Sequence, residues 1–159
     1  MRVDFLGWDH PLQASTLYDI AKIHQSRGRV KKALQICKVV ISIQHESLGE
    51  RHIDVAKTLL TQGSCFVTKG ETDDASTALQ ESLHIAETLL PAGKHPLVAE
   101  IHTEIGALYL RKCQFDCARQ SIQRALELYN ESLVDEDYHG IQHAKEILAQ
   151  VERDEMLCV

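Results

Sequence analysis

Proline and glycine are scarce in this 159-residue chain, which contains three prolines and eight glycines. A β-sandwich needs more turn residues than that, whereas the residues that helices prefer, such as Ala, Leu, Glu and Lys, are plentiful. The formal net charge of −6 argues against broad nucleic-acid binding, because phosphate recognition depends on clustered Lys and Arg. We therefore expect an all-α chain, either one compact domain or a short repeat array, with no nucleic-acid partner.

Signals for secretion and membrane insertion are also missing. The five cysteines are odd in number and form no Cys-x-x-Cys pair, which is typical of a reduced, intracellular chain. No stretch of 18 apolar residues occurs, and the first eight residues lack a charged start followed by a long apolar core. We expect a cytoplasmic protein with neither a signal peptide nor a membrane span.

The chain contains an internal repeat of 42 to 43 residues. His10, His52 and His95 each open a similar amphipathic segment, at offsets of 42 and then 43. The same offsets relate three alanines, Ala33, Ala75 and Ala118, while Gly28 and Gly70 match at 42. The one extra residue falls near 91–93, where a loop can absorb it.

Each repeat unit is predicted to form two helices, because apolar and small residues recur at spacings of three and four. The first helices are expected at 12–26, 54–68 and 97–111, and the second helices at 30–46, 72–90 and 115–133. A helical pattern at 141–151 predicts a capping helix followed by a frayed tail. The predicted divisions are 1–11 (connector), 12–51, 52–94 and 95–137 (repeats), 138–153 (capping helix) and 154–159 (tail).

Small residues mark the predicted crossing point of each helix pair. Ala21, Gly63 and Gly106 occupy this place on the first helices, where two helix axes must approach closely. Gly28 and Gly70 are expected to end the first two of these helices in the left-handed conformation. In the third unit Cys113 stands at that place, so its turn must differ or carry strain.

These positions resemble the tetratricopeptide repeat family. The 42-residue period and the connectors Leu6-Gly7-Trp8-Asp9-His10-Pro11 and Leu48-Gly49-Glu50-Arg51-His52-Ile53 resemble its kinesin light chain subclass. The resemblance implies a right-handed α-solenoid of about three helix pairs plus the capping helix. The Asn-Asn pair that this subclass carries on the first helix is replaced by Tyr18-Asp19, Leu60-Thr61 and Thr103-Glu104, and Gln62 stands where an apolar residue is usual.

The resemblance also implies a concave groove, lined by the first helices, that binds a peptide segment of a protein partner. The residues implied to line it are Ser15, Tyr18, Lys22, Gln25, Lys57, Leu60, Ser64, Val67, Glu100, Thr103, Ala107 and Leu110. They form a groove that is basic at one end, apolar in the middle and mildly acidic at the other. The alternative is a structural or self-associating subunit, such as a truncated part of a longer array, that docks through an open N-terminal helix pair. An uncapped repeat leaves apolar surface uncovered.

Candidate chemistry is sparse. His10, His52 and His95 recur with the repeat and are expected to cap helices, so they have a structural explanation. His139 and His143, and likewise Cys113 and Cys117, have the four-residue spacing of metal ligands, but no His-Glu-x-x-His motif accompanies them.

We expect Cys113 and Cys117 to be buried as small apolar residues. The sequence also lacks a phosphate-binding loop, a dinucleotide-binding Gly-x-Gly-x-x-Gly motif and a Gly-x-Ser-x-Gly elbow. It therefore predicts no catalytic residue, no cofactor, no metal site and no enzymatic activity.

Two charged segments have open interpretations. The basic run of Arg27, Arg29, Lys31 and Lys32 is expected to be a solvated turn, with a nuclear-import or anion-binding patch as the alternative. The acidic residues that crowd the C-terminal part are expected to form a solvated face, with a docking patch for a basic partner as the alternative.

Overall fold

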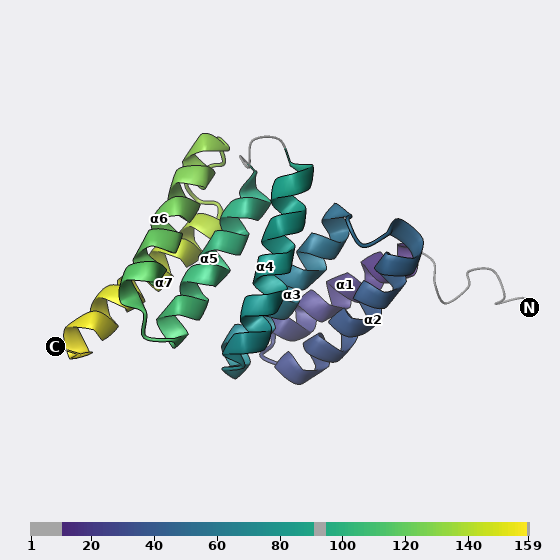
Figure 1. The fold of residues 1–159 in the computed structure, drawn as a ribbon, viewed down its shortest axis with the longest axis horizontal. Coiled ribbons are helices and arrows are strands. Elements are labelled where there is room, and N and C mark those ends of the chain that lie inside the picture. Colours follow the sequence, from purple (N-terminus) through teal and green to yellow (C-terminus); the bar gives the residue numbers. More distant parts are fainter. Residues whose placement is uncertain (1–10, 91–94, 159) are drawn as a thin grey trace, which may run out of the picture.

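The computed structural model describes residues 11–90 and 95–158, and within these ranges the regular structure is entirely helical. The helices pair in sequence order (Figure 1). Their bounds are α1 Pro11–Ser26, α2 Val30–Leu48, α3 Ile53–Lys69, α4 Thr72–Leu89, α5 Pro96–Arg111, α6 Phe115–Glu131 and α7 His139–Cys158. The six repeat helices confirm the predicted ranges to within two residues at each end.

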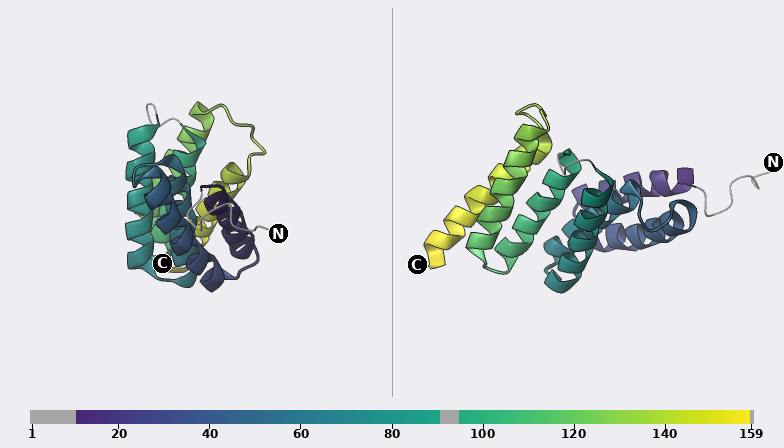
Figure 2. Two further views of the ribbon diagram at one scale, coloured as in Figure 1. Left: turned by 90° about the vertical axis from the view of Figure 1, so that its right-hand side faces the viewer. Right: turned by 45° about the horizontal axis from the view of Figure 1, so that its top comes forward.

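The helices stack as an elongated solenoid rather than a closed globule. Each helix packs against its neighbours in sequence, and the first helices also contact one another in the order α1, α3, α5, α7. Figure 2 shows α1 and α7 at opposite ends of the stack. The first helices therefore form one continuous side, which we call the first-helix face, and α7 takes the place of a fourth first helix.

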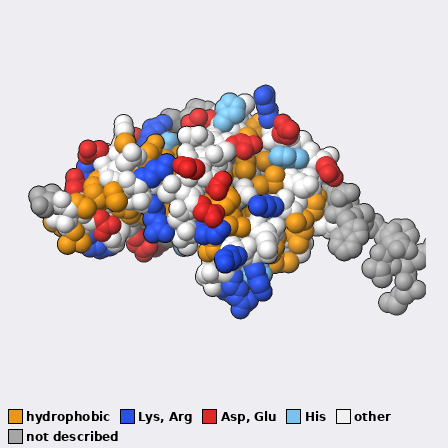
Figure 3. Space-filling view, turned by 60° about the horizontal axis from the view of Figure 1, so that its bottom comes forward, with side chains coloured by type: hydrophobic (Ala, Val, Ile, Leu, Met, Phe, Trp, Pro, Cys, Tyr) orange, Lys and Arg blue, Asp and Glu red, His pale blue; other side chains and the backbone are white. Residues whose placement is uncertain are grey.

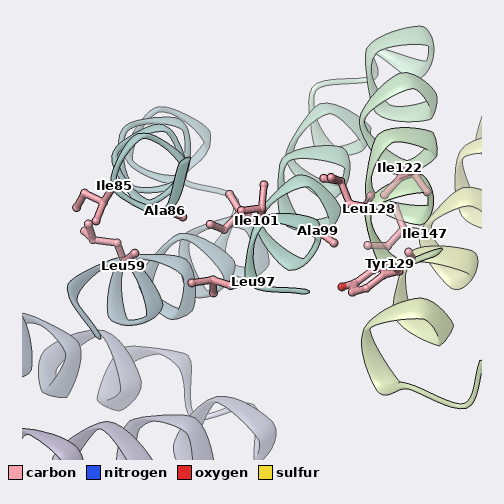
Figure 4. Packing of buried hydrophobic residues seen from close by; sticks show 14 of the residues in the cluster. Leu59, Ile85, Ala86, Leu97, Ala99, Ile101, Ile122, Leu128, Tyr129 and Ile147 are labelled. Atoms are coloured by element: carbon pink, nitrogen blue, oxygen red, sulfur yellow. The ribbon is translucent and has the colours of Figure 1, made fainter. Parts of the chain in front are cut away.

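The largest core cluster joins α3 to α7. Ile101, Ile122, Leu128 and Tyr129 are almost fully buried within it, and Figure 4 shows them packed between α4, α5 and α6 beside Ile147 of α7. Burying such side chains stabilises the fold by about 1.5–3 kcal/mol each relative to exposure. The apolar sides of neighbouring units thus shield one another, as a repeat array requires.

The small residues on the first helices allow the close approach that the sequence predicted. A Cβ atom added to Gly63 would lie 2.7 Å from the Leu79 side chain, and one added to Gly106 would lie 2.4 Å from Ile122 Cδ1. Both distances are far below van der Waals contact. The absence of a side chain at these two positions is therefore what lets α3 meet α4, and α5 meet α6, at this separation.

The turn between α5 and α6 has the strain expected from a cysteine at a glycine position. Cys113 has a φ of 57°, in the same left-handed region as Gly28 at 69° and Gly70 at 85°. A residue with a Cβ in this conformation is destabilised by about 1–2 kcal/mol. The repeat geometry imposes the turn even where the sequence does not favour it.

The C-terminal helix is longer than predicted. Helix α7 continues to Cys158, so the expected frayed tail over 154–159 is wrong for the described residues up to 158. Arg119 of α6 pairs with Glu155, and Gln150 Nε2 donates to Asp154 Oδ1 at 2.5 Å. The Arg119–Glu155 pair holds the last turns of α7 against α6, and the Gln150–Asp154 bond lies within α7 itself.

Candidate peptide-binding face

The first-helix face brings most of the predicted groove residues to the surface. Ser15 and Lys22 are exposed, and eight others are half-buried: Tyr18, Gln25, Lys57, Leu60, Ser64, Glu100, Ala107 and Leu110. They come from α1, α3 and α5, which lie in order along this face.

Val67 and Thr103 do not belong to the lining, because both are buried. Val67 packs with Ala75, Leu79 and Leu108 between α3, α4 and α5. The Thr103 hydroxyl donates to the Ala99 carbonyl at 3.0 Å within its own helix. Packing between helices covers both positions, although residues at the same place in the other units are accessible.

The α1 end of the face is aromatic and basic. Lys22 Nζ lies 6.0 Å from the ring centroid of Tyr18, at the limit of a cation–π contact. The Thr61 hydroxyl of α3 donates to the Tyr18 hydroxyl at 3.5 Å, and burial raises the pKa of Tyr18. Lys57 Nζ lies 3.0 Å from Asp54 Oδ1, which partly neutralises the second lysine.

The α5 end is acidic, and it contains residues that sequence reasoning missed. Glu104 lies one turn after Glu100 on α5, and its Oε1 is 3.4 Å from His143 Nε2 of α7. The Tyr138 hydroxyl donates to Glu100, and burial raises the pKa of Tyr138 to about 12. The four-residue spacing of the two glutamates signals their shared face, but only the packing of α7 on α5 brings Tyr138 and His143 to them.

The hydrogen bond to Glu104 raises the pKa of His143. When His143 is protonated, its positive charge therefore lies next to the Glu104 carboxylate across the α5–α7 contact. This pair links α5 and α7 at the acidic end of the face, where the sequence predicted only a capping helix.

The histidines that open the repeats are helix caps. His52 Nδ1 accepts from the Asp54 amide at 3.2 Å, and His95 Nδ1 accepts from the Leu97 amide at 3.1 Å. Each bond satisfies an amide that the first turn of a helix leaves without a partner. The capping prediction is confirmed for these two residues, and His10 lies outside the described residues.

Other candidates for chemistry do not converge. Within residues 11–90 and 95–158 no group of three or more His, Cys, Asp or Glu side chains could hold a metal ion. Cys113 and Cys117 are both exposed, so the expectation that they are buried is wrong. Cys113 falls in the turn after α5, and Cys117 lies on the outer side of the first turn of α6, where no helix covers it.

The basic segment at the first turn is exposed to solvent. Arg27, Arg29, Lys31 and Lys32 are all exposed around the turn from α1 to α2, as the sequence predicted. In Figure 3, Lys and Arg side chains gather over the N-terminal half of the molecule with acidic side chains beside them.

One side of α1 is open in a way that its counterparts are not. Ile23 is 48% exposed, whereas the residues at the same register on α3 and α5, Cys65 and Leu108, are 0% and 4% exposed. Cys65 is covered by Ala33 and Leu34 of α2, the second helix of the preceding unit. Leu12 and Ile20 are exposed alongside Ile23. On α3 this side is therefore covered by the second helix of the preceding unit, whereas on α1 the corresponding apolar side is exposed.

A solenoid of paired helices whose first helices form a continuous, half-polar face defines a repeat scaffold. A sequence profile of the tetratricopeptide repeat family matches residues 12–88. Residues 12–88, the first two helix pairs, are thus tetratricopeptide repeats, and the chain is similar to kinesin light chain proteins. Tetratricopeptide repeats generally serve as scaffolds for protein–protein interaction. Among the described residues, no helix is long and apolar enough to cross a membrane.

Two curated relatives show how far the similarity extends in sequence. The chain is 24% identical over 136 residues to the rat mitochondrial tetratricopeptide repeat protein 19, covering 86% of this chain and 33% of the relative. It is 24% identical over 132 residues to the kinesin light chain-related protein 1 of Arabidopsis thaliana, covering 83% of this chain and 21% of the relative. The chain thus spans a third or less of each relative's length.

Solved structures confirm the all-α solenoid. A putative kinesin light chain of Podospora anserina with nearly identical repeats superposes with a TM-score of 0.70 at 17% identity, covering 96% of this chain and 71% of that one. BtubC from P. vanneervenii superposes with a TM-score of 0.66 at 18% identity, covering 94% and 66%.

Proposed function

We propose that this chain is a protein–protein interaction scaffold that binds a peptide segment of a partner across the first-helix face. The observation that carries the proposal is the ordered change of character along α1, α3 and α5. Lys22 and Tyr18 lie at one end, Leu60 lies in the middle, and Glu100 and Glu104 lie at the other end. An extended segment gains both an apolar anchor and a preferred direction from such a face.

The charges specify the direction of the bound segment. Its acidic part would lie over α1 and α3, beside Lys22 and Lys57, and its basic part would lie over Glu100 and Glu104 of α5. The five cysteines are all free, which supports a reducing compartment and hence the cytoplasm as the proposed location.

The test compares partners captured by the wild type and by two face variants. Leu60→Glu places a charge in the apolar middle, and Lys22→Glu reverses a charge that is exposed and takes no part in the core. Gln123→Glu, on the exposed side of α6, is the matched control. We expect the partners identified by mass spectrometry after pull-down to be lost from both face variants and kept by the control.

Circular dichroism shows whether each variant is folded, so that loss of a partner is not confused with unfolding. Leu60 packs partly against the core, so Leu60→Glu counts only if its melting curve stays cooperative, whereas Lys22→Glu should melt like the wild type. Retention of every partner by folded Lys22→Glu and Leu60→Glu would rule out this face as the binding surface.

A second candidate function is self-association through the open side of α1. The exposure of Leu12, Ile20 and Ile23 favours it, since the corresponding side of α3 is covered by another helix. The outer side of α7 is different, because it carries exposed Gln142, Lys145 and similar polar residues. Light scattering at tens of micromolar tests this candidate: a concentration-dependent dimer abolished by Ile23→Lys would support it, and a strict monomer would exclude it.

A further inference from the structure

A second groove lies on the opposite side of α3, between the second helices α2 and α4. It has a volume of about 610 Å3. Lys31 and Lys38 of α2 form one wall, Asp74 and Glu81 of α4 form the other, and Gln62 and Phe66 of α3 lie in the floor. Leu60 and Ser64 point to the first-helix face instead, so this groove is separate from the proposed peptide site.

The two walls carry opposite charges that do not neutralise each other. Lys31, Lys38, Asp74 and Glu81 form no ion pair with any described residue, although all four are exposed. On each helix the two charges are seven residues apart, which places them on the same side about 10.5 Å from each other. The groove thus presents one basic and one acidic edge, each two helical turns long.

The floor offers an apolar surface and an unused amide. Phe66 is half-buried, so part of its ring is accessible from the groove. Gln62 occupies the register of Ile20 on α1 and Ile105 on α5. No other residue that the structure describes forms a hydrogen bond with its side-chain amide. A half-buried amide without a partner can bind a polar group of a molecule that lies over it.

This pattern is not a property of the repeat itself. One unit further along, the positions of Lys31 and Lys38 are taken by Asp73 and Gln80, and the position of Glu81 is taken by Arg124. Among the described helices, the oppositely charged edges and the Gln62 amide therefore occur only at the groove between α2 and α4. Packing of the repeat does not require them.

We propose that this groove binds an amphipathic helix of a protein partner. The helix carries carboxylates seven residues apart along the edge that faces α2, and lysines or arginines seven residues apart along the edge that faces α4. An apolar stripe between the two edges lies on Phe66. The opposite signs of the walls fix both the orientation of the helix and its register, because a half-turn rotation would bring like charges together.

The test uses a synthetic helical peptide with this pattern, about fourteen residues long, so that it covers two full heptads. The peptide has Glu pairs on one edge, Lys pairs on the other and Leu between them, and it carries a fluorescent label for anisotropy titration at fixed low salt. The protein variant Lys31→Glu/Lys38→Glu reverses one wall. Lys32→Glu/Arg51→Glu makes the same change in net charge at exposed positions outside the groove.

We expect the wall reversal to weaken binding about tenfold, because two favourable charge pairs become repulsive. The control should bind like the wild type. A second peptide, with the Glu edge changed to Lys, should recover affinity for the reversed protein and lose it for the wild type. Three results would each overturn the proposal: no binding of the first peptide to the wild type, equal weakening by Lys32→Glu/Arg51→Glu, or no recovery of affinity when the second peptide meets the reversed protein.

Discussion

The close contact of α5 with α6 makes Gly106→Ala a sharp test of the packing. Alanine favours a helix over glycine by about 1 kcal/mol, so an unobstructed substitution would stabilise the protein. Here the new methyl group would meet Ile122 Cδ1 at 2.4 Å and Cγ1 at 2.7 Å. Overpacking of this kind destabilises by about 1–3 kcal/mol. Subtracting the helix-propensity gain leaves a net loss of up to about 2 kcal/mol, measured by urea denaturation followed by circular dichroism.

The first repeat supplies the compensating substitution. At the register of Gly106 and Ile122 it carries Ala21 and Cys37, a larger residue opposite a smaller one, and both are fully buried. Adding Ile122→Cys to Gly106→Ala should therefore relieve the overlap. The double variant should be more stable than the sum of the two single effects by about 1 kcal/mol.

Two outcomes would refute this account of the crossing point. A Gly106→Ala variant that is more stable than the wild type by about 1 kcal/mol would mean that α5 and α6 move apart freely. Strict additivity in the cycle would mean that Ile122 is not what the new methyl group meets.

Three further predictions concern single residues. Cys113→Gly should raise the free energy of unfolding by about 1 kcal/mol, because glycine adopts the positive φ without a Cβ penalty, and a lower value would contradict the strain. Under native conditions an aromatic disulfide reagent should label three cysteines quickly. It should spare Cys37 and Cys65, whose pKa values burial raises to about 12 and about 11, until the protein unfolds. His143→Gln should lower the free energy of unfolding below pH 6.5, because His143 has a raised pKa and is charged there beside Glu104. At pH 9 the substitution should have little effect. Equal losses at both pH values would contradict the ion pair.

Features that repeat along the chain could be predicted from the sequence. The recurrence of His52 and His95 led to the helix caps, and the small residues Gly63 and Gly106 led to the close crossings, because each has a local cause that the same spacing repeats. The strained turn at Cys113 followed from the same comparison. In each case one unit supplied the expectation for another.

Features set by the angles between helices could not be predicted. Val67 and Thr103 have the register of groove residues, yet both are buried by packing between helices. Cys117 lies on the amphipathic helix α6 but faces outward. The acidic end of the first-helix face depends on α7 folding back on α5, which brings His143 to Glu104. Gln62 was an irregularity in the sequence, and only its position between α2 and α4 shows that it lies in a groove.

The central claim, that one peptide segment lies across the first-helix face, is tested most directly by site-specific photo-crosslinking. A benzophenone amino acid is placed in turn at Ser64 of α3 and at Ala107 of α5, which share a register, and at Gln123 of α6 as the control. The account predicts that Ser64 and Ala107 crosslink to the same short segment of the same partner and that Gln123 does not. Crosslinks from Gln123 to that segment, with none from Ser64 or Ala107, would contradict it.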